Sequence, residues 1–234
     1  DGELAIVNNV FTEQEAFGVK ALSDCVRTLL GTNNRFVDAR AFDTDEEDYG
    51  LYKHGGNYVT FLSGLMQRHL PGAVAAIYEA IGAAYDNLNW EKTGAASPGT
   101  LGLRTAEDLE YRRTGRLGSH YDDGSLFTIS VAMGEPDSYE GGYFRLDSEQ
   151  AMFKVSRLSA VVFFSEDYHG VTPISKGQRN VFVVELWDND HVPPGHGRSD
   201  PEEFERFKKS VRNGHEFKFD DKVTEEVEGD IGHD

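Results

Sequence analysis

The chain has 234 residues, of which 38% are hydrophobic and 12% aromatic, the composition of a folded globular protein rather than a disordered one. Its 41 acidic and 23 basic side chains give a formal net charge of -18, which repels nucleic-acid phosphates and anionic lipid headgroups. We therefore expect no nucleic-acid partner and no membrane partner.

The first 31 residues predict a short strand followed by a helix. Thr12 and Glu15 form a T-x-x-E capping box at the helix start, and Gly31 suits the position just past its end. Cys25 is the only cysteine, so no intrachain disulfide can form. It lies in an apolar-periodic run, "AFGVKALSDCVRTLL", and we expect it in the core.

A second helical region is predicted over residues 58–90, with Pro71 separating two helices. Residues 32–57, between the two helical regions, carry the acidic run "DTDEEDYG" and are predicted to be a loop at the rim of an opening. The stretch "RTAEDLEYRR", residues 104–113, is a second predicted rim.

From residue 100 onwards, short β-branched and aromatic runs alternate with turn signals such as "DDGS" and "SKGQ". This spacing predicts a sandwich or barrel. Pro201 and Gly214 bound one more predicted helix. We expect one domain over residues 1–234: an N-terminal strand with supporting helices (1–99), a barrel core (100–190), and a C-terminal helix with an acidic tail (191–234).

The stretch "GSHYDDGS", residues 118–125, places His120 and Asp122 on one face of an extended segment. An H-x-D pair alone is equally typical of a polar turn. His169 follows a strongly apolar strand, a position from which it could project into a cavity. Two imidazoles and one carboxylate on one side of an ion form the arrangement of non-haem Fe(II) sites. Asp123 is predicted to point away.

Arg179 opens the strand "RNVFVVELW", ten residues after His169. A guanidinium that enters an apolar barrel must meet a carboxylate, because a buried charge has to be paired. Arginine is well shaped to hold a small dicarboxylic acid through two hydrogen bonds. The alternative is an exposed arginine at a strand end.

The segments "YRRTGRLGSHYDD", "FTISVAM", "GGYF" and "YHGVTPISKGQR" occur in an order and spacing that resembles the Fe(II)- and 2-oxoglutarate-dependent oxygenases, in their prolyl 4-hydroxylase-like branch. The resemblance covers Tyr111–Trp187 directly. It implies an α+β, mainly β fold: a double-stranded β-helix (jelly-roll or cupin-like) barrel flanked by N-terminal helices and one C-terminal helix. It also implies that His120, Asp122 and His169 are the iron ligands and the catalytic residues.

The same resemblance implies a cosubstrate pocket. Arg179 would pair with the distal carboxylate of 2-oxoglutarate, and the hydroxyl of Tyr111 would reach the cosubstrate. Many relatives carry an aromatic residue where this chain has Ala132, so that either a hydroxyl such as that of Ser130 assists Arg179 or the pocket is roomier. The other residues expected on the pocket's inner face are Thr128, Val171, Val181 and Val183.

The implied activity is hydroxylation of a C–H bond, most specifically in a prolyl residue of a peptide or protein, with succinate and CO2 as coproducts. Fe(II), 2-oxoglutarate as cosubstrate and O2 are the implied cofactors, with ascorbate as a further candidate. Two alternatives stay open: the same chemistry on a free amino acid or small metabolite, and a metal-dependent cupin-like hydrolase or isomerase or an inactive binding module. We expect a soluble, cytoplasmic monomer, although the chain begins with Asp and any removed targeting segment is invisible.

Overall fold

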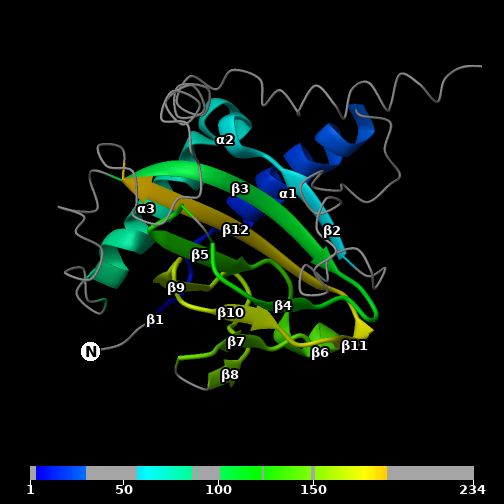
Figure 1. Ribbon diagram of the computed structural model, residues 1–234. Coiled ribbons are helices and arrows are strands. Elements are labelled where there is room, and N and C mark those ends of the chain that lie inside the picture. The colour runs from blue at the N-terminus through cyan, green and yellow to red at the C-terminus, as the bar shows by residue number, and fades with distance from the viewer. Residues whose placement is uncertain are drawn as a thin grey trace, which may run out of the picture.

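The structure is a computed structural model that describes residues 4–29, 57–85, 88, 101–122, 124–148 and 151–188. Within these residues, the larger of the sheets has six antiparallel strands (Figure 1). In spatial order they are β1 (Leu4–Val7), β9 (Ala160–Phe164), β5 (Phe127–Ala132), β12 (Arg179–Asp188), β3 (Leu101–Tyr111) and β2 (Asn57–Phe61).

A second sheet of four antiparallel strands lies against one face of the first sheet. Two further strands form a separate antiparallel pair. The four strands are β4 (Leu117–His120), β10 (His169–Val171), β7 (Phe144–Leu146) and β8 (Ala151–Phe153). The pair is β11 (Ile174–Gly177) with β6 (Tyr139–Gly141), which follows a short 3-10 turn at Pro136–Ser138.

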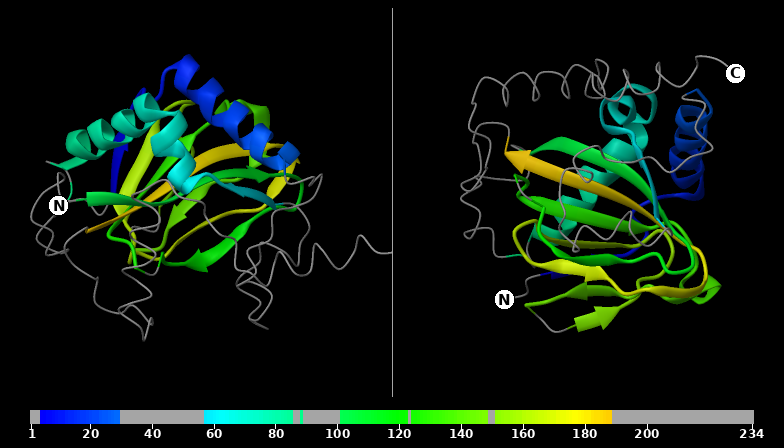
Figure 2. Two further views of the ribbon diagram at one scale, coloured as in Figure 1. Left: turned by 90° about the horizontal axis from the view of Figure 1, so that it is seen from above. Right: turned by 45° about the vertical axis from the view of Figure 1, so that its right-hand side comes forward.

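Helices α1 (Glu13–Leu29), α2 (Ser63–His69) and α3 (Pro71–Tyr85) cover the opposite face of the six-stranded sheet, as Figure 2 shows. The predicted capping box begins α1: the Thr12 N–H donates to Glu15 Oε2 at 2.7 Å, and the Glu15 N–H donates to Thr12 Oγ1 at 3.3 Å. Pro71 is the first residue of α3 and separates it from α2, as the sequence predicts. None of the helices in the described ranges is long and apolar enough to cross a membrane.

The alternation of side chains along β12 divides the interior into two layers. Phe182, Val184 and Leu186 pack with the helices in the main hydrophobic core. Val181 and Val183 point the other way and pack with residues between the two sheets. Because successive strand residues face opposite sides, Arg179 and Glu185 share the face of these two valines, toward the space between the sheets.

Three local expectations are wrong. Cys25 is exposed, because the buried side of α1 carries Val19 and Ser23 and Cys25 lies on the other side of the helix. Residues 57–61 form strand β2 rather than a helix or loop. Residues 104–111 belong to the long strand β3 between β12 and β2, where sheet pairing overrides the polar sequence, so they are not a rim loop.

Other expectations lie outside the described residues. These are Gly31 as a helix end, the acidic loop up to residue 56, Asp123 and the C-terminal helix and tail. The division of the chain at residues 99 and 190 and the monomeric state stay predictions.

Candidate active site

Strand pairing brings the two candidate histidine ligands together. His120 ends β4, His169 begins β10, and the two are register partners in the four-stranded sheet. Their ring centroids are 4.3 Å apart. Residues distant in sequence by nearly fifty positions therefore present their imidazoles side by side.

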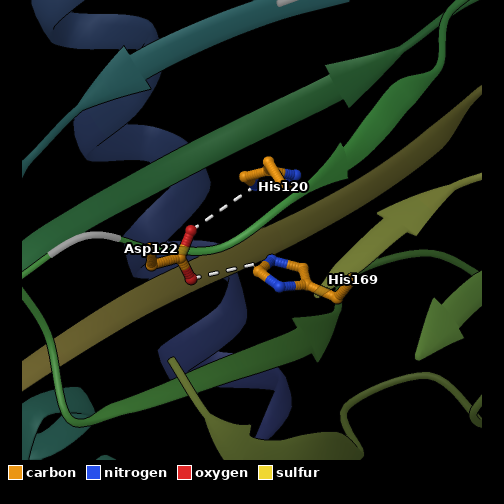
Figure 3. A group of neighbouring side chains, drawn as sticks. All are labelled: His120, Asp122 and His169. Carbon is orange, nitrogen blue, oxygen red and sulfur yellow. Dashed lines mark ion pairs between the residues drawn. The ribbon is translucent and has the colours of Figure 1, made fainter. Parts of the chain in front are cut away.

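Asp122 completes the group from the turn after β4, with its carboxylate facing both rings (Figure 3). The Nε2 atom of His120 lies 3.5 Å from Asp122 Oδ1, and that of His169 lies 3.6 Å from Asp122 Oδ2. One potential ligand atom from each residue lies within 4.8 Å of the others. Ligand bonds of roughly 2.1 Å at right angles place ligand atoms roughly 3 Å apart, so small side-chain movements would close this group on one ion.

Hydrogen bonds orient all three side chains. Nδ1 of His120 is 3.0 Å from the Gly118 carbonyl oxygen, and Nδ1 of His169 is 3.0 Å from the Asp167 carbonyl oxygen. A carbonyl only accepts, so each Nδ1 carries a proton; the Nε2 atom can then bind a metal ion when the ring is neutral, or donate to Asp122 when the ring is protonated. This is the second-shell arrangement that fixes imidazole ligands in metal sites.

The turn that carries Asp122 is tied to the larger sheet. Its backbone N–H donates to the Ser165 carbonyl at 2.8 Å, and its carbonyl accepts from the Ser125 N–H at 3.2 Å. The Thr128 hydroxyl donates to Asp122 Oδ2 and lies 2.9 Å from the hydroxyl of Ser165. The sequence expected Thr128 on the inner face of the pocket, and the structure places it directly behind the carboxylate.

Burial and charge set the protonation of these groups. Burial raises the pKa of Asp122, but the charges of the two imidazoles and the hydrogen bonds from His120 and Thr128 outweigh it, so that the pKa lies below its ordinary value. Burial lowers the pKa of His169. Burial also acts to lower the pKa of His120, but the hydrogen bond and the charge of Asp122, together with the bond to Gly118, outweigh it and raise that pKa. Asp122 is thus a carboxylate and His169 a neutral imidazole at neutral pH, as metal ligation requires.

A pocket lies between the two sheets and contains Arg179. Its side chain is 6% exposed, and its Nη1 atom is buried without a hydrogen-bond partner among the described residues. A buried guanidinium with an unmet donor is costly. This arrangement fits a carboxylate ligand and contradicts the alternative of an exposed arginine at a strand end.

Tyr111 and Arg179 are register partners on β3 and β12, and the guanidinium carbon lies 5.1 Å from the centre of the tyrosine ring. Burial raises the pKa of Tyr111 to about 12, so its hydroxyl stays protonated. The charges of both Arg179 and Asp122 act on it. Tyr111 is therefore within electrostatic reach of both Asp122 and Arg179.

The remaining predicted residues fall into two groups. Ser130, Ala132 and Val181 line the pocket with Arg179. Val171 packs with Tyr111 and Val181 in the apolar cluster between the sheets, and Val183 packs against the same cluster.

Two polar side chains that line the pocket, Tyr139 and Lys154, were not predicted from the sequence. Tyr139 begins β6 and its hydroxyl interacts with Arg179, which lowers the tyrosine's pKa against the larger effect of burial. Lys154 follows β8 and reaches into the same pocket. Its position depends on two short strands and their turns, and no spacing in the sequence signals it.

The two glycines of "GGYF" explain how Tyr139 and Arg179 approach each other. Gly142 lines the pocket and has a positive φ of 64°. A Cβ there would lie 2.3 Å from Ile174 Cδ1 and 3.1 Å from Arg179 Cδ. Only glycine fits this turn without displacing the arginine.

Comparison with known proteins supports the fold. No protein-family model and no curated protein matches the chain. A prolyl hydroxylase from Trichoplax adhaerens, in complex with a hypoxia inducible factor peptide fragment, is similar in structure with a TM-score of 0.52 and 13% identity, over 80% of this chain and 84% of that one.

Two further structures are similar at a TM-score of 0.50 and 13% identity. The viral collagen prolyl hydroxylase of Paramecium Bursaria Chlorella virus-1, in its 2OG complex, is matched over 79% of this chain and 95% of that one. An oxidoreductase of the 2OG-Fe(II) oxygenase family from Burkholderia pseudomallei is matched over 82% and 87%. At this identity the likeness concerns the fold, and it confirms the predicted mainly β, double-stranded β-helix architecture and the resemblance at that level.

Proposed function

We propose that this chain is an Fe(II)- and 2-oxoglutarate-dependent dioxygenase that hydroxylates a C–H bond. One observation carries the proposal: three oriented metal-ligand candidates share a barrel with a buried arginine whose Nη1 has no partner among the described residues. A hydrolase or isomerase would use the metal ligands but would leave Arg179 without a dicarboxylate partner. The fold shared with 2OG-Fe(II) oxygenases supports the same assignment.

The residues present fit such a metal. Two imidazole nitrogens and one carboxylate oxygen suit non-haem Fe(II) and leave its other positions open. His120, Asp122 and His169 would hold the ion. Bound Fe(II), together with 2-oxoglutarate and O2, would supply the oxidising power that converts C–H to C–OH, with succinate and CO2 as coproducts.

The rest of the site would bind, orient and exclude water. Arg179 would hold the distal carboxylate of 2-oxoglutarate. Phe163 and Phe144 lie 4.5 and 6.0 Å from the His169 ring, centre to centre, and place apolar surface against this candidate ligand. Such walls keep water from the reacting atoms.

For the substrate we propose a prolyl residue in a peptide. Two of the similar structures are prolyl hydroxylases, and one of them holds a peptide fragment. Ascorbate stays a candidate further cofactor that only the sequence resemblance implies. The proposal for the substrate rests on likeness of fold.

One observation favours the alternative, a free amino acid or small metabolite. Glu185 faces the interior as the register partner of Thr128, and its charge acts on His120. It pairs with Arg104, and Ser125 Oγ donates to it at 2.6 Å. This cluster places a positive side chain, Arg104, and a negative one, Glu185, beside the metal ligands. Such an arrangement suits a substrate that has an ammonium and a carboxylate group better than it suits a proline ring.

Anaerobic addition of Fe(II) and 2-oxoglutarate tests the reaction class. The proposal predicts a visible metal-to-ligand charge-transfer band that requires Asp122 and is lost or weakened in Arg179→Ala. Absence of a band in the intact protein, with 2-oxoglutarate affinity unchanged by Arg179→Ala, would overturn the assignment in favour of a hydrolase, an isomerase or a binding module.

Succinate release over a panel of prolyl peptides and free amino acids then tests the substrate. Peptide-dependent release supports a prolyl hydroxylase. Release that depends on free amino acids and falls in Glu185→Gln, a variant that keeps the shape of the side chain and removes its charge, supports the alternative.

A further inference from the structure

The pocket that holds Arg179 is positively charged and walled by apolar side chains. Its walls come from both sheets, and none of the described residues that line it is acidic. A carboxylate removed from water needs opposite charge and hydrogen bonds around it. The lining residues are Ser130, Ala132, Tyr139, Gly142, Phe144, Phe153, Lys154, Val155, Val161, Arg179 and Val181.

Lys154 is the second cation of this pocket. Its Nζ atom donates to the carbonyl oxygens of Pro136 at 2.9 Å and Tyr139 at 2.8 Å, and it lies 3.9 Å from the centre of the Tyr139 ring. An ammonium has three donors, and these two bonds use two of them. The bonds hold the ammonium at a fixed place in the pocket wall.

The two cations affect each other. Burial lowers the pKa of Lys154, and the charge of Arg179 lowers it further, against the opposing effects of Asp137 and Glu140. Glu140 is itself paired with Lys176 at 3.1 Å and is exposed. Two like charges in one pocket raise its free energy until an anion is bound.

We propose that Lys154 is a second cationic anchor for the distal carboxylate of 2-oxoglutarate, beside Arg179, and that it makes the pocket selective for dicarboxylates. This inference rests on the proposed function. Tyr139 joins the two cations, because its hydroxyl interacts with Arg179 and its ring and carbonyl hold Lys154. Arg179, Lys154 and Tyr139 would together provide the contacts to the carboxylate to which many relatives add an aromatic residue at the position of Ala132.

A purely structural role for Lys154 makes a different prediction. Its two hydrogen bonds tie the turn before β6 to the end of β8. If that were its whole role, replacing it would weaken binding of any ligand in the pocket to the same degree. An anchor acts only on ligands that carry a distal negative charge.

Calorimetric titration of the anaerobic Fe(II)-loaded protein separates these roles without any turnover. The ligands are 2-oxoglutarate and 2-oxopentanoate, which has the same chain length and lacks the distal carboxylate. The proteins are wild type, Lys154→Met, Lys154→Arg and the control Lys176→Met, whose lysine is exposed and also close to Glu140. A change in fold would show in thermal unfolding of each variant.

The proposal predicts that Lys154→Met weakens 2-oxoglutarate binding roughly tenfold or more, the effect of a charged hydrogen bond. Binding of 2-oxopentanoate should be unchanged, Lys154→Arg should keep most of the affinity, and Lys176→Met should match wild type. Equal 2-oxoglutarate affinity in wild type and Lys154→Met, or equal losses for both ligands, would overturn this inference alone. No 2-oxoglutarate binding to wild type would overturn the proposed function as well.

Discussion

The metal-ligand group and the cationic pocket lie in the same barrel, but their charges are balanced to different degrees. Asp122 faces two imidazoles and accepts a bond from Thr128, so the group is internally satisfied. The pocket combines Arg179 and Lys154 with apolar walls, and among the described residues one buried donor, Arg179 Nη1, has no partner.

Because of this difference, the two regions would bind different parts of a ligand. The metal-ligand group can assemble on its own and offers an ion an oriented set of donors. The pocket carries unbalanced positive charge, and an anion would lower its free energy. A ligand that carries a metal-chelating end and a distal carboxylate would satisfy both regions at once.

The largest expected effect is loss of the metal in Asp122→Ala. The variant removes the one anionic ligand and leaves the two imidazoles without their common partner. We expect Fe(II) affinity to fall by at least a hundredfold and succinate formation to be abolished, measured by anaerobic titration and by product analysis. Asp123→Ala is the neighbouring control and should keep its iron; equal losses in the two variants would contradict the assignment of the ligand.

The second-largest effect is expected from Arg179→Met, which should weaken 2-oxoglutarate binding without destabilising the protein. Loss of a bidentate charged contact should weaken 2-oxoglutarate binding roughly a hundredfold. Removing a buried, incompletely paired charge should leave the free energy of unfolding unchanged or higher by about 1 kcal/mol. Urea unfolding and calorimetry test both parts. Arg157→Met, which removes an exposed pair with Glu13, should change neither by much, and a strongly destabilised Arg179→Met would mean that the arginine is structural.

A smaller effect is expected from Thr128→Val, which keeps the side-chain shape and removes the bond to Asp122. Loss of a group that orients a ligand typically lowers metal affinity by about tenfold. Ser119→Ala, which removes a hydroxyl bonded to Asp147 instead, is the matched control. Unchanged iron affinity in Thr128→Val would show that Asp122 is held well enough by its backbone bonds.

The smallest effect concerns pH, and its sign differs between the metal-free and metal-bound protein. The folded pKa of His120 is raised above its ordinary value of 6.5, so the metal-free protein gains stability from this group below pH 6.5, and loses that gain as pH rises through the folded pKa. Metal binding displaces the proton, so Fe(II) affinity should instead fall as pH falls through that range.

Unfolding curves and metal titrations between about pH 5.5 and 8 measure these two trends. Metal affinity that is constant across the interval would show that His120 is not a ligand.

How far each region could be predicted follows from how it is built. His120 and Asp122 lie two residues apart on an extended segment, and His169 and Arg179 mark the ends of β-branched runs, so their patterns are visible in the sequence. Strand pairing then places them as expected. The resemblance to the oxygenases also implied that Thr128 faces the pocket, but its hydrogen bond to Asp122 was not predicted.

The other polar residues of the pocket could not be predicted from the sequence in this way. Tyr139 and Lys154 belong to strands of three residues or to the turn after one, which are too short to show a period. The approach of Tyr139 to Arg179 also depends on the positive φ of Gly141 and Gly142. Strand β3 was missed for a different reason: its polar residues are buried by pairing with β12 and β2, which local sequence does not reveal.

If the metal-ligand group and the cationic pocket bind one ligand between them, the binding of Fe(II) and that of 2-oxoglutarate must be thermodynamically coupled. The affinity of 2-oxoglutarate should be measured by anaerobic calorimetry with and without Fe(II), and that of Fe(II) with and without 2-oxoglutarate. The account predicts that each strengthens the other by the same factor, tenfold or more, as linkage requires. Independent binding of the two, or no binding of 2-oxoglutarate in the presence of iron, would contradict it.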